Sequence, residues 1–281
     1  MSLPPALRLV AALGRTYGLT AVLLVVVCFP LFWMGVTSLK PQTEIFQVPP
    51  TWLPRTWTLR NYRDLFSLTD FGRLFVNSLK VCLSSTLLSL ILGTGGAYGL
   101  ARFQFRGKWL CSRSVLLAYM FPGALLVIPL VVIFARLGLT NSHLGLALAY
   151  LTFALPFVLW VMRGFFRGIP VDLEEAALID GASRLGAFVD VALPQAMPGI
   201  IATGIFTFIF AWNEYLLALI LISDESLRTL PPGLMRFVSA TDVNWGLMMA
   251  ASVVVTLPMA AVFGFVQRHL VTGIGAGGVK G

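Results

Sequence analysis

The chain has 281 residues, of which 58% are hydrophobic and only 11% are charged, and its mean hydropathy is +0.87. A soluble globular domain carries about 25% charged residues, so a soluble fold of this size would have too little polar surface to cover its core. Intrinsic disorder is excluded as well, because it requires low hydrophobicity. The remaining class is a multi-pass membrane protein, whose apolar excess is solvated by the bilayer.

The formal net charge of +8 is explained by the same class, because cytoplasmic loops of membrane proteins gather Lys and Arg. No basic stripe or nucleic-acid motif accompanies the charge, so we expect no nucleic-acid partner. The three cysteines, an odd number without a C-x-x-C pair, predict neither a disulfide framework nor a metal site.

Six apolar segments approach or exceed the roughly 20 residues that a spanning helix needs. They are residues 18–39, 74–100, 114–134, 144–161, 200–222 and 245–266. The third is interrupted by Pro122 and Pro129, which spanning helices tolerate where neighbours satisfy the freed carbonyls. The sequence therefore predicts an all-α integral membrane fold of six transmembrane helices over residues 18–266.

The two ends of the chain are predicted to lie outside the spans. Residues 1–17 are expected to form a cytoplasmic or interfacial segment, with 4–17 as a short surface helix. A signal peptide is the alternative for the first apolar run, but this run is too long and lacks an A-x-A site. Residues 267–281 are expected to be a glycine-rich cytoplasmic tail.

The orientation follows from the short loops. Residues 101–113 carry four basic residues and no acidic one, which favours the cytoplasmic side. With six spans, both termini then lie in the cytoplasm. In the second span Ser85, Ser89 and Gly93 recur every four residues, a spacing that lets helix backbones approach closely in lipid.

Residues 170–194 are too polar to span and too patterned to be a simple linker. Pro170 suits the first turn of a helix, and Asp172, Glu174 and Glu175 would follow near the positive end of its dipole. Gly181 can adopt the left-handed conformation that ends such a helix.

A second, amphipathic helix is predicted after that turn. Ser183 is a plausible N-cap, and Pro194 and Pro198 are expected to break the helix before the fifth span. One apolar stripe is predicted at Leu185, Phe188, Val189 and Ala192. This helix–turn–helix would either rest on lipid headgroups or insert into the groove of a cytoplasmic partner.

The same segment resembles a known signature, E-A-A-x3-G-x9-I-x-L-P. Glu175-Ala176-Ala177, Gly181 and Leu193-Pro194 match it, and Val191 replaces the isoleucine. The signature is typical of the membrane permeases of binding-protein-dependent ABC importers. Further matches resemble the MalG-like permeases of the carbohydrate-uptake subfamily: Asn77-Ser78-Leu79, Ala97-Tyr98, Arg102-Phe103, Phe121-Pro122 and Trp212-Asn213-Glu214.

The resemblance implies one permease subunit of a heteromeric, ATP-driven importer in the inner (plasma) membrane of a prokaryote. Its partners would be a MalF-like permease, a cytoplasmic ABC ATPase dimer, an extracytoplasmic solute-binding protein and the lipid bilayer. Its cargo would be a di- or oligosaccharide, or a related solute such as a glycerol phosphate. The residues expected to couple to the ATPase are Glu174, Glu175, Ala176, Ala177, Asp180, Gly181, Leu193 and Pro194.

The chain itself is expected to be non-catalytic and to bind no cofactor. It contains no G-x-x-x-x-G-K-[ST] motif that could cradle ATP phosphates, so ATP and magnesium would be bound by the partner ATPase. The alternative function is an ion-gradient-driven secondary transporter, which predicts paired charges within the membrane and internal repeats.

Four polar or aromatic residues in the fifth span are candidates for a functional role. Trp212, Asn213 and Tyr215 could line the solute pathway, because aromatic faces and amides suit sugars. Glu214 is a candidate for helix packing or for solute contact. On a continuous helix it would share a face with Gly204, Thr207, Ala211 and Ala218.

Overall fold

The computed structural model describes residues 5–235 and 244–277, and it describes side chains for residues 16–235 and 244–264. Every regular element in these residues is helical, which confirms the all-α class. The chain divides into two compact units, Met1–Asp70 with Phe237–Leu257 and Phe71–Arg236 with Pro258–Gly281.

The first unit contains α1 (Pro5–Ser38), α2 (Gln42–Ile45), α3 (Arg60–Ser67) and the beginning of α14 (Trp245–Gly277). The separate surface helix expected over residues 4–17 is not found in the described part of that range, because α1 runs from Pro5 continuously into the first span. The physical reason is that no proline interrupts the backbone ladder between the first turn and Pro30.

Side-chain hydrogen bonds hold together the connection after α1, which contains α2 and α3. The buried carboxylate of Glu44 accepts from the Thr51 hydroxyl at 2.6 Å and from the Arg55 N–H at 3.0 Å. The Thr51 hydrogen bond is the main reason that the pKa of Glu44 is lowered. The Asn61 amide donates to the carbonyls of Ser38 and Lys40, both at 2.8 Å, and so ties α3 to the end of α1.

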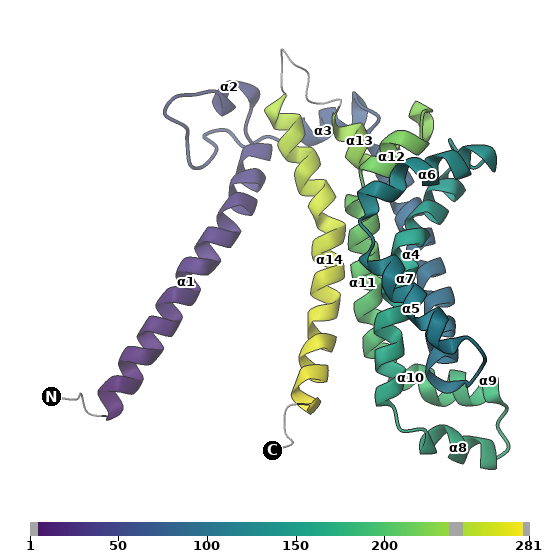
Figure 1. Cartoon of the computed structure of the whole chain (residues 1–281). Helices are drawn as coiled ribbons and strands as arrows, with labels where there is room; N and C mark the ends of the chain where they lie inside the picture. The colour runs from purple at the N-terminus through teal and green to yellow at the C-terminus, as the bar shows by residue number, and fades with distance from the viewer. Residues whose placement is uncertain (1–4, 236–243, 278–281) are drawn as a thin grey trace. The chain divides into compact units, whose positions relative to one another are not determined.

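The second unit is built on α4 (Phe71–Arg102), α7 (His143–Gly168) and α11 (Met197–Asn213), which pack against one another (Figure 1). Ser85, Ser89 and Gly93 of α4 are buried. A Cβ placed on Gly93 would lie 2.6 Å from Cγ1 of Val158 on α7. The predicted small-residue stripe is therefore confirmed as a close approach of two helices.

The remaining elements of this unit are short. They are α5 (Lys108–Met120), α6 (Gly123–Arg136), α8 (Asp172–Ile179), α9 (Arg184–Gly186), the π-helix η1 (Ala187–Ala192), α10 (Leu193–Gln195), α12 (Leu216–Leu221), the 3-10 turn η2 (Glu225–Leu227) and α13 (Leu230–Leu234).

The third span is not one helix. It bends by 105° between α5 and α6, at Phe121 and Pro122. Phe121 is extended, with φ −73° and ψ 132°, because the ring of a following proline excludes the helical conformation. Pro129, by contrast, lies inside α6 without ending it.

The loop after the fifth span is fixed to the start of the second. The Asn77 amide donates to the carbonyls of Ser226 and Arg228 at 2.9 Å each. The N–H of Leu230 donates to the Ser78 hydroxyl at 2.7 Å. The asparagine and serine that mark the start of α4 thus hold a segment about 150 residues away in sequence.

Within the described residues, four unbroken helices are long and apolar enough to cross a membrane: Thr16–Ser38, Phe71–Arg102, His143–Gly168 and Trp245–Gly264. Two bent pairs also pass, α5 with α6 and Arg184–Gln195 with Met197–Asn213. Counting each bent pair as one span gives up to six. In the second pair only Met197–Asn213 overlaps the predicted fifth span, because Arg184–Gln195 belongs to the segment 170–194. The expected start of a tail at residue 267 differs from the structure, because α14 continues to Gly277.

Candidate functional site

The patterned segment after α7 contains the predicted first helix, α8, followed by a left-handed glycine. Pro170 lies before the N-cap, Val171, and not in the first turn of α8 as predicted. Gly181 has φ +92°. Its N–H donates to the Leu178 carbonyl at 3.2 Å, and the Ala182 N–H donates to the Ala177 carbonyl at 2.9 Å. These two bonds form a Schellman motif, which ends a helix and reverses the chain.

The second helix starts at the predicted cap but ends later than predicted. The Ser183 hydroxyl accepts from the Gly186 N–H at 3.1 Å. Pro194 does not break the helix; the change of direction comes at Ala196, and Pro198 lies in the first turn of α11. The π-helix before Pro194 explains this, because its wider turn relieves the clash of the proline ring with the carbonyl four residues earlier.

The predicted apolar stripe of this helix divides between two surroundings. Ala192 is fully buried and Phe188 is partly buried against the second unit's core. Leu185 and Val189 remain 69% and 44% exposed. The expectation of one docking stripe is therefore corrected. Phe188 and Ala192 pack against the same chain, and only Leu185 and Val189 remain exposed for contact with a partner.

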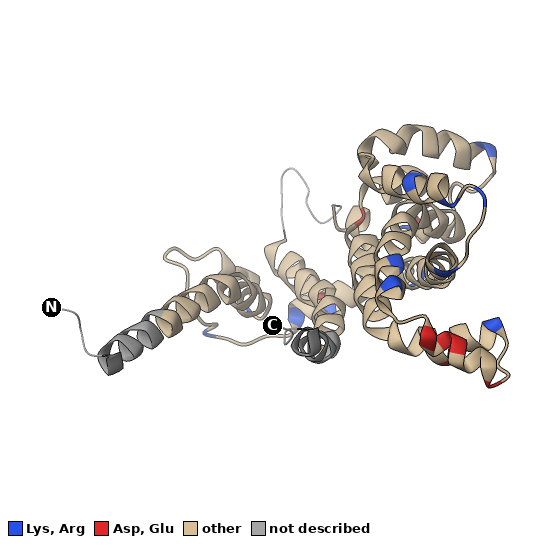
Figure 2. Ribbon diagram, turned by 60° about the horizontal axis from the view of Figure 1, so that its bottom comes forward, with Lys and Arg blue, Asp and Glu red and all other residues tan. Residues whose placement is uncertain are grey.

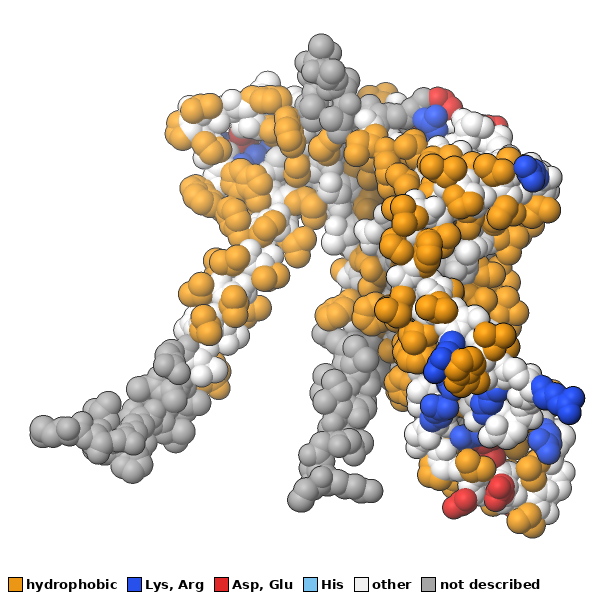
Figure 3. Space-filling view, in the orientation of Figure 1, with side chains coloured by type: hydrophobic (Ala, Val, Ile, Leu, Met, Phe, Trp, Pro, Cys, Tyr) orange, Lys and Arg blue, Asp and Glu red, His pale blue; other side chains and the backbone are white. Residues whose placement is uncertain are grey.

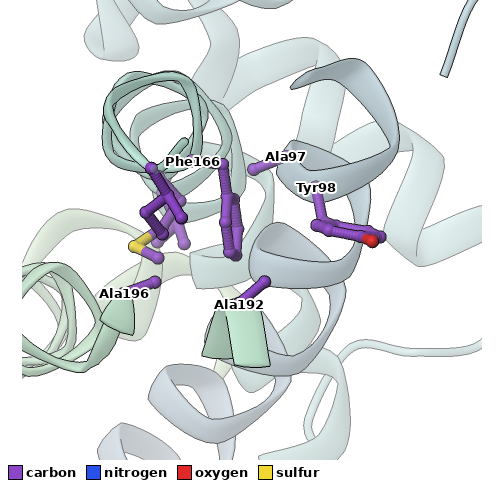
Figure 4. Packing of buried hydrophobic residues seen from close by; sticks show 8 residues of the cluster. Ala97, Tyr98, Phe166, Ala192 and Ala196 are labelled. Carbon is purple, nitrogen blue, oxygen red and sulfur yellow. The ribbon is translucent and has the colours of Figure 1, made fainter. Parts of the chain in front are cut away.

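Three aromatic rings form the joint between the segment and the spans. The ring centroid of Tyr98 lies 5.4 Å from that of Phe166 and 4.5 Å from that of Phe188. Figure 4 shows Phe166 on α7 extending toward Ala192, with Tyr98 of α4 to one side. α4, α7 and η1 each contribute one ring, so the segment packs against two long apolar helices at once.

A buried ion pair fastens α8 to the end of α4. Glu174 accepts from the Tyr98 hydroxyl at 2.7 Å and from the Arg102 guanidinium at 2.7 Å, through both Nε and Nη2. Arg102 also donates to the Ile169 carbonyl at 2.9 Å. Glu174, expected to face the ATPase, instead points into its own chain, since a buried carboxylate needs a partner charge.

Sequence reasoning missed the roles of Arg102 and Tyr98. Both lie in short matches to the subfamily, and nothing in those matches specified a partner. One signal was available: a lone basic residue in the last turn of a span, on the side where an acidic first turn follows.

The other predicted coupling residues lie mostly at the surface. Glu175, Ala176, Asp180, Gly181 and Pro194 are exposed, while Ala177 and Leu193 are half-buried. Ile179, which lies next to them, is 85% exposed. Figure 2 shows acidic residues along α8, at the end of the second unit. The segment thus presents a mixed acidic and apolar surface.

The fifth span breaks where the sequence predicted a continuous helix. α11 ends at Asn213, and Glu214 is extended, with φ −70° and ψ 122°. Its carboxylate accepts from the N–H groups of Leu217 and Ala218 at 3.0 and 3.2 Å, and so caps α12. Glu214 does form structural hydrogen bonds, but it does not share a helix face with Ala218, which belongs to α12.

Trp212 is a packing residue. Its side chain is 3% exposed, and its ring centroid lies 5.6 Å from Phe208 and 5.7 Å from Phe75. The expectation that Trp212 lines the pathway is corrected, because its enclosed ring presents no free face to a solute. Asn213 is exposed and Tyr215 is half-buried, so these two stay candidates.

Comparison with known proteins agrees with this architecture. Residues 85–275 match the family described as the inner membrane component of binding-protein-dependent transport systems. The chain is 39% identical to the inner membrane ABC transporter permease protein YcjP of Escherichia coli, over 98% of each chain. It is 36% identical to the diacetylchitobiose uptake system permease protein DasC of Streptomyces coelicolor, over 95% of this chain and 98% of DasC.

A solved structure shares the fold. It is the crystal structure of a bacterial ABC transporter involved in the import of the acidic polysaccharide alginate. The match has a TM-score of 0.82 at 21% sequence identity and covers 95% of this chain and 99% of the other. With the family match spanning more than half of the sequence, the chain belongs to the inner membrane permeases of binding-protein-dependent ABC transport systems.

Proposed function

We propose that this chain is one of two permease subunits of an ATP-driven importer for a carbohydrate. The second subunit would be a MalF-like permease, and a solute-binding protein would deliver the cargo on the extracytoplasmic side. A pair of ABC ATPases in the cytoplasm would supply the energy. Family membership supports this assignment over an ion-gradient-driven transporter.

The observation that carries the proposal is the rigid attachment of an exposed segment. Residues 172–194 project a surface with Ile179, Leu185 and Glu175 exposed, while Glu174 and Phe188 fasten the same segment to α4 and α7. A segment that is exposed on one side and packed against the spans on the other can transmit rigid motion from an ATPase groove to those spans.

Catalysis would belong to the partners. We propose that this subunit hydrolyses no ATP and binds no cofactor, with ATP and magnesium bound on the ATPases. The purified subunit reconstituted by itself is expected to show no ATPase activity, whereas the full assembly shows activity that rises with loaded binding protein. Hydrolysis by the isolated subunit would contradict this division of roles.

Cross-linking tests the docking surface directly. In a variant whose three native cysteines are replaced, Ile179→Cys is expected to form a cross-link with the ATPase subunit in the assembled complex. Ile128→Cys is the matched control, because Ile128 is 76% exposed on α6 of the same unit. A position-179 variant that cross-links no better than the control would refute the proposed docking.

A saccharide cargo is supported by the relative whose printed name specifies diacetylchitobiose uptake and by the subfamily matches in the sequence. Asn213 and Tyr215 are the residues of this chain that we propose for the pathway. The test is to identify the ligand that co-purifies with the solute-binding protein of the assembled importer. A peptide or an amino acid in place of a saccharide would contradict the cargo class.

A further inference from the structure

A basic cavity lies in the second unit, apart from residues 170–194. It has a volume of about 610 Å³ and lies between α5 and α7. Its charged lining residues are Lys108, Arg113, Arg163 and Arg167, and its lining includes no Asp or Glu. Figure 3 shows blue side chains gathered on this unit, below a surface that is mainly apolar.

The cavity is built by two facing helix stripes. Trp160, Arg163 and Arg167 follow one another at i, i+3 and i+7 on α7. Trp109 and Arg113 lie four residues apart on α5, and the Arg113 guanidinium lies 3.6 Å from the Trp109 ring centroid. Residues at these spacings share a helix face, so the cations converge on one volume rather than spreading around their helices.

Two polar atoms in this cavity lack a protein partner. Arg163 Nε and Ser112 Oγ are buried and make no hydrogen bond with any described residue. The four cations likewise make no ion pair with a carboxylate in the described part of the chain. Buried polar atoms normally find a partner, and four neighbouring positive charges with no carboxylate among them repel one another, so an anion with several acceptor oxygens would complete the site.

The surroundings identify the kind of anion. The cavity lies beside the cytoplasmic-loop end of a spanning helix, and its two tryptophans are of the type that marks the membrane interface. On α5, Leu110 and Leu117 are 62% and 67% exposed beside it. Arginine pairs bidentately with phosphate, and basic pockets between spanning helices on the cytoplasmic side suit lipid headgroups.

We propose that this cavity binds the phosphate of an anionic phospholipid from the cytoplasmic leaflet, with the acyl chains lying along the apolar surface of α5. The group recognised is a phosphate, which a lipid headgroup has in common with inorganic phosphate. Arg163, Arg113 and the Ser112 hydroxyl would hold it. The assignment requires membership of the membrane permease family, and it is independent of the cargo and of the ATPase docking.

Native mass spectrometry of the assembled importer tests the site, with phosphatidylglycerol titrated against phosphatidylcholine of identical acyl chains. Arg163→Gln and Arg113→Gln are each expected to weaken phosphatidylglycerol binding about fivefold, the effect of one basic residue near anionic lipid. Arg136→Gln, which removes the same charge from the exposed end of α6, is expected to leave binding unchanged. Wild-type phosphatidylglycerol binding by both cavity variants would overturn the proposal.

A further arm separates lipid from soluble phosphate. A large molar excess of inorganic phosphate is expected not to displace phosphatidylglycerol, because the acyl chains add apolar contacts that the free ion lacks. Displacement by phosphate would assign the cavity to a soluble anion and overturn the lipid assignment. Arg113 is exposed, so its variant gives an answer even if Arg163→Gln fails to assemble.

Discussion

At the scale of single residues, one buried pair and one glycine shape the segment of residues 170–194. Glu174 and Arg102 hold α8 against α4, and Gly181 reverses the chain so that the second helix returns to the spans. The neighbouring acid, Glu175, is exposed. Two adjacent carboxylates therefore have different tasks, one internal and one directed outward.

Replacing each acid separates those tasks. Glu174→Ala is expected to destabilise the segment by about 3–5 kcal/mol, because it leaves Arg102 buried without its partner. The measurement is tryptic cleavage at Arg184 in the assembled complex. Glu175→Ala is the matched control and should leave cleavage unchanged while reducing uptake. Equal cleavage in the two variants would show that the internal pair does not hold the segment.

Gly181→Val is expected to abolish uptake while the subunit still reaches the membrane. The φ of +92° costs a residue with a Cβ about 1–2 kcal/mol, so the turn would shift and misplace the exposed surface. Gly164→Val serves as the control, because a Cβ there meets nothing within 4 Å. Uptake and membrane content are measured together; normal uptake by the position-181 variant would argue against the docking proposal.

At the scale of elements, small residues decide which helices pair. α4 and α7 come close because Gly93 and the serines before it leave room for the side chains of α7. In lipid, such close packing contributes more than hydrophobic burial, which is equally available from acyl chains. The breaks after α5 and α11 depend equally on local chemistry, a proline at one and a capping carboxylate at the other.

Gly93→Val tests the helix pairing. The added side chain would overlap Val158, and overpacking of this kind typically costs about 1–3 kcal/mol. We expect a lower thermal unfolding temperature for the purified complex. Gly95→Val introduces the same side chain two residues later, where nothing lies within 4 Å, and should leave the unfolding temperature nearly unchanged. Similar losses at both positions would mean that helix propensity, and not packing, is responsible.

At the scale of the whole molecule, the six-span arrangement predicts which surfaces lie on which side of the membrane. The short basic loop 101–113 favours the cytoplasm, and residues 170–194 are expected on the same side because two spans separate them from that loop. The connection after α1 then lies on the extracytoplasmic side.

Labelling with a membrane-impermeant maleimide checks that orientation. In a variant without the native cysteines, Val48→Cys, at a position 93% exposed, should be labelled in intact cells. Ile179→Cys, at a position 85% exposed, should be labelled only after the membrane is permeabilised. Labelling of position 179 in intact cells would reverse the assigned orientation.

Much of this architecture could be predicted from residue types and their spacing. The stripe that includes Gly93, the left-handed Gly181 and the Ser183 cap all depend on local chemistry, and each was found where expected. Four of the apolar runs form unbroken helices, whereas the third and fifth are broken. The signature around Glu175 likewise identifies the family from the sequence alone.

Contacts between distant segments could not be read in the same way. The sequence does not show that Glu174 meets Arg102, that Trp212 is enclosed between Phe208 and Phe75, or that the arginines of α5 and α7 converge. Periodicity along one helix fixes which residues share a face, but the partner of that face depends on how helices far apart in sequence pack together. The sequence by itself therefore determined the class, the approximate spans and the family signature, whereas the tertiary structure alone decided which side chains of residues 170–194 point inward and which remain free.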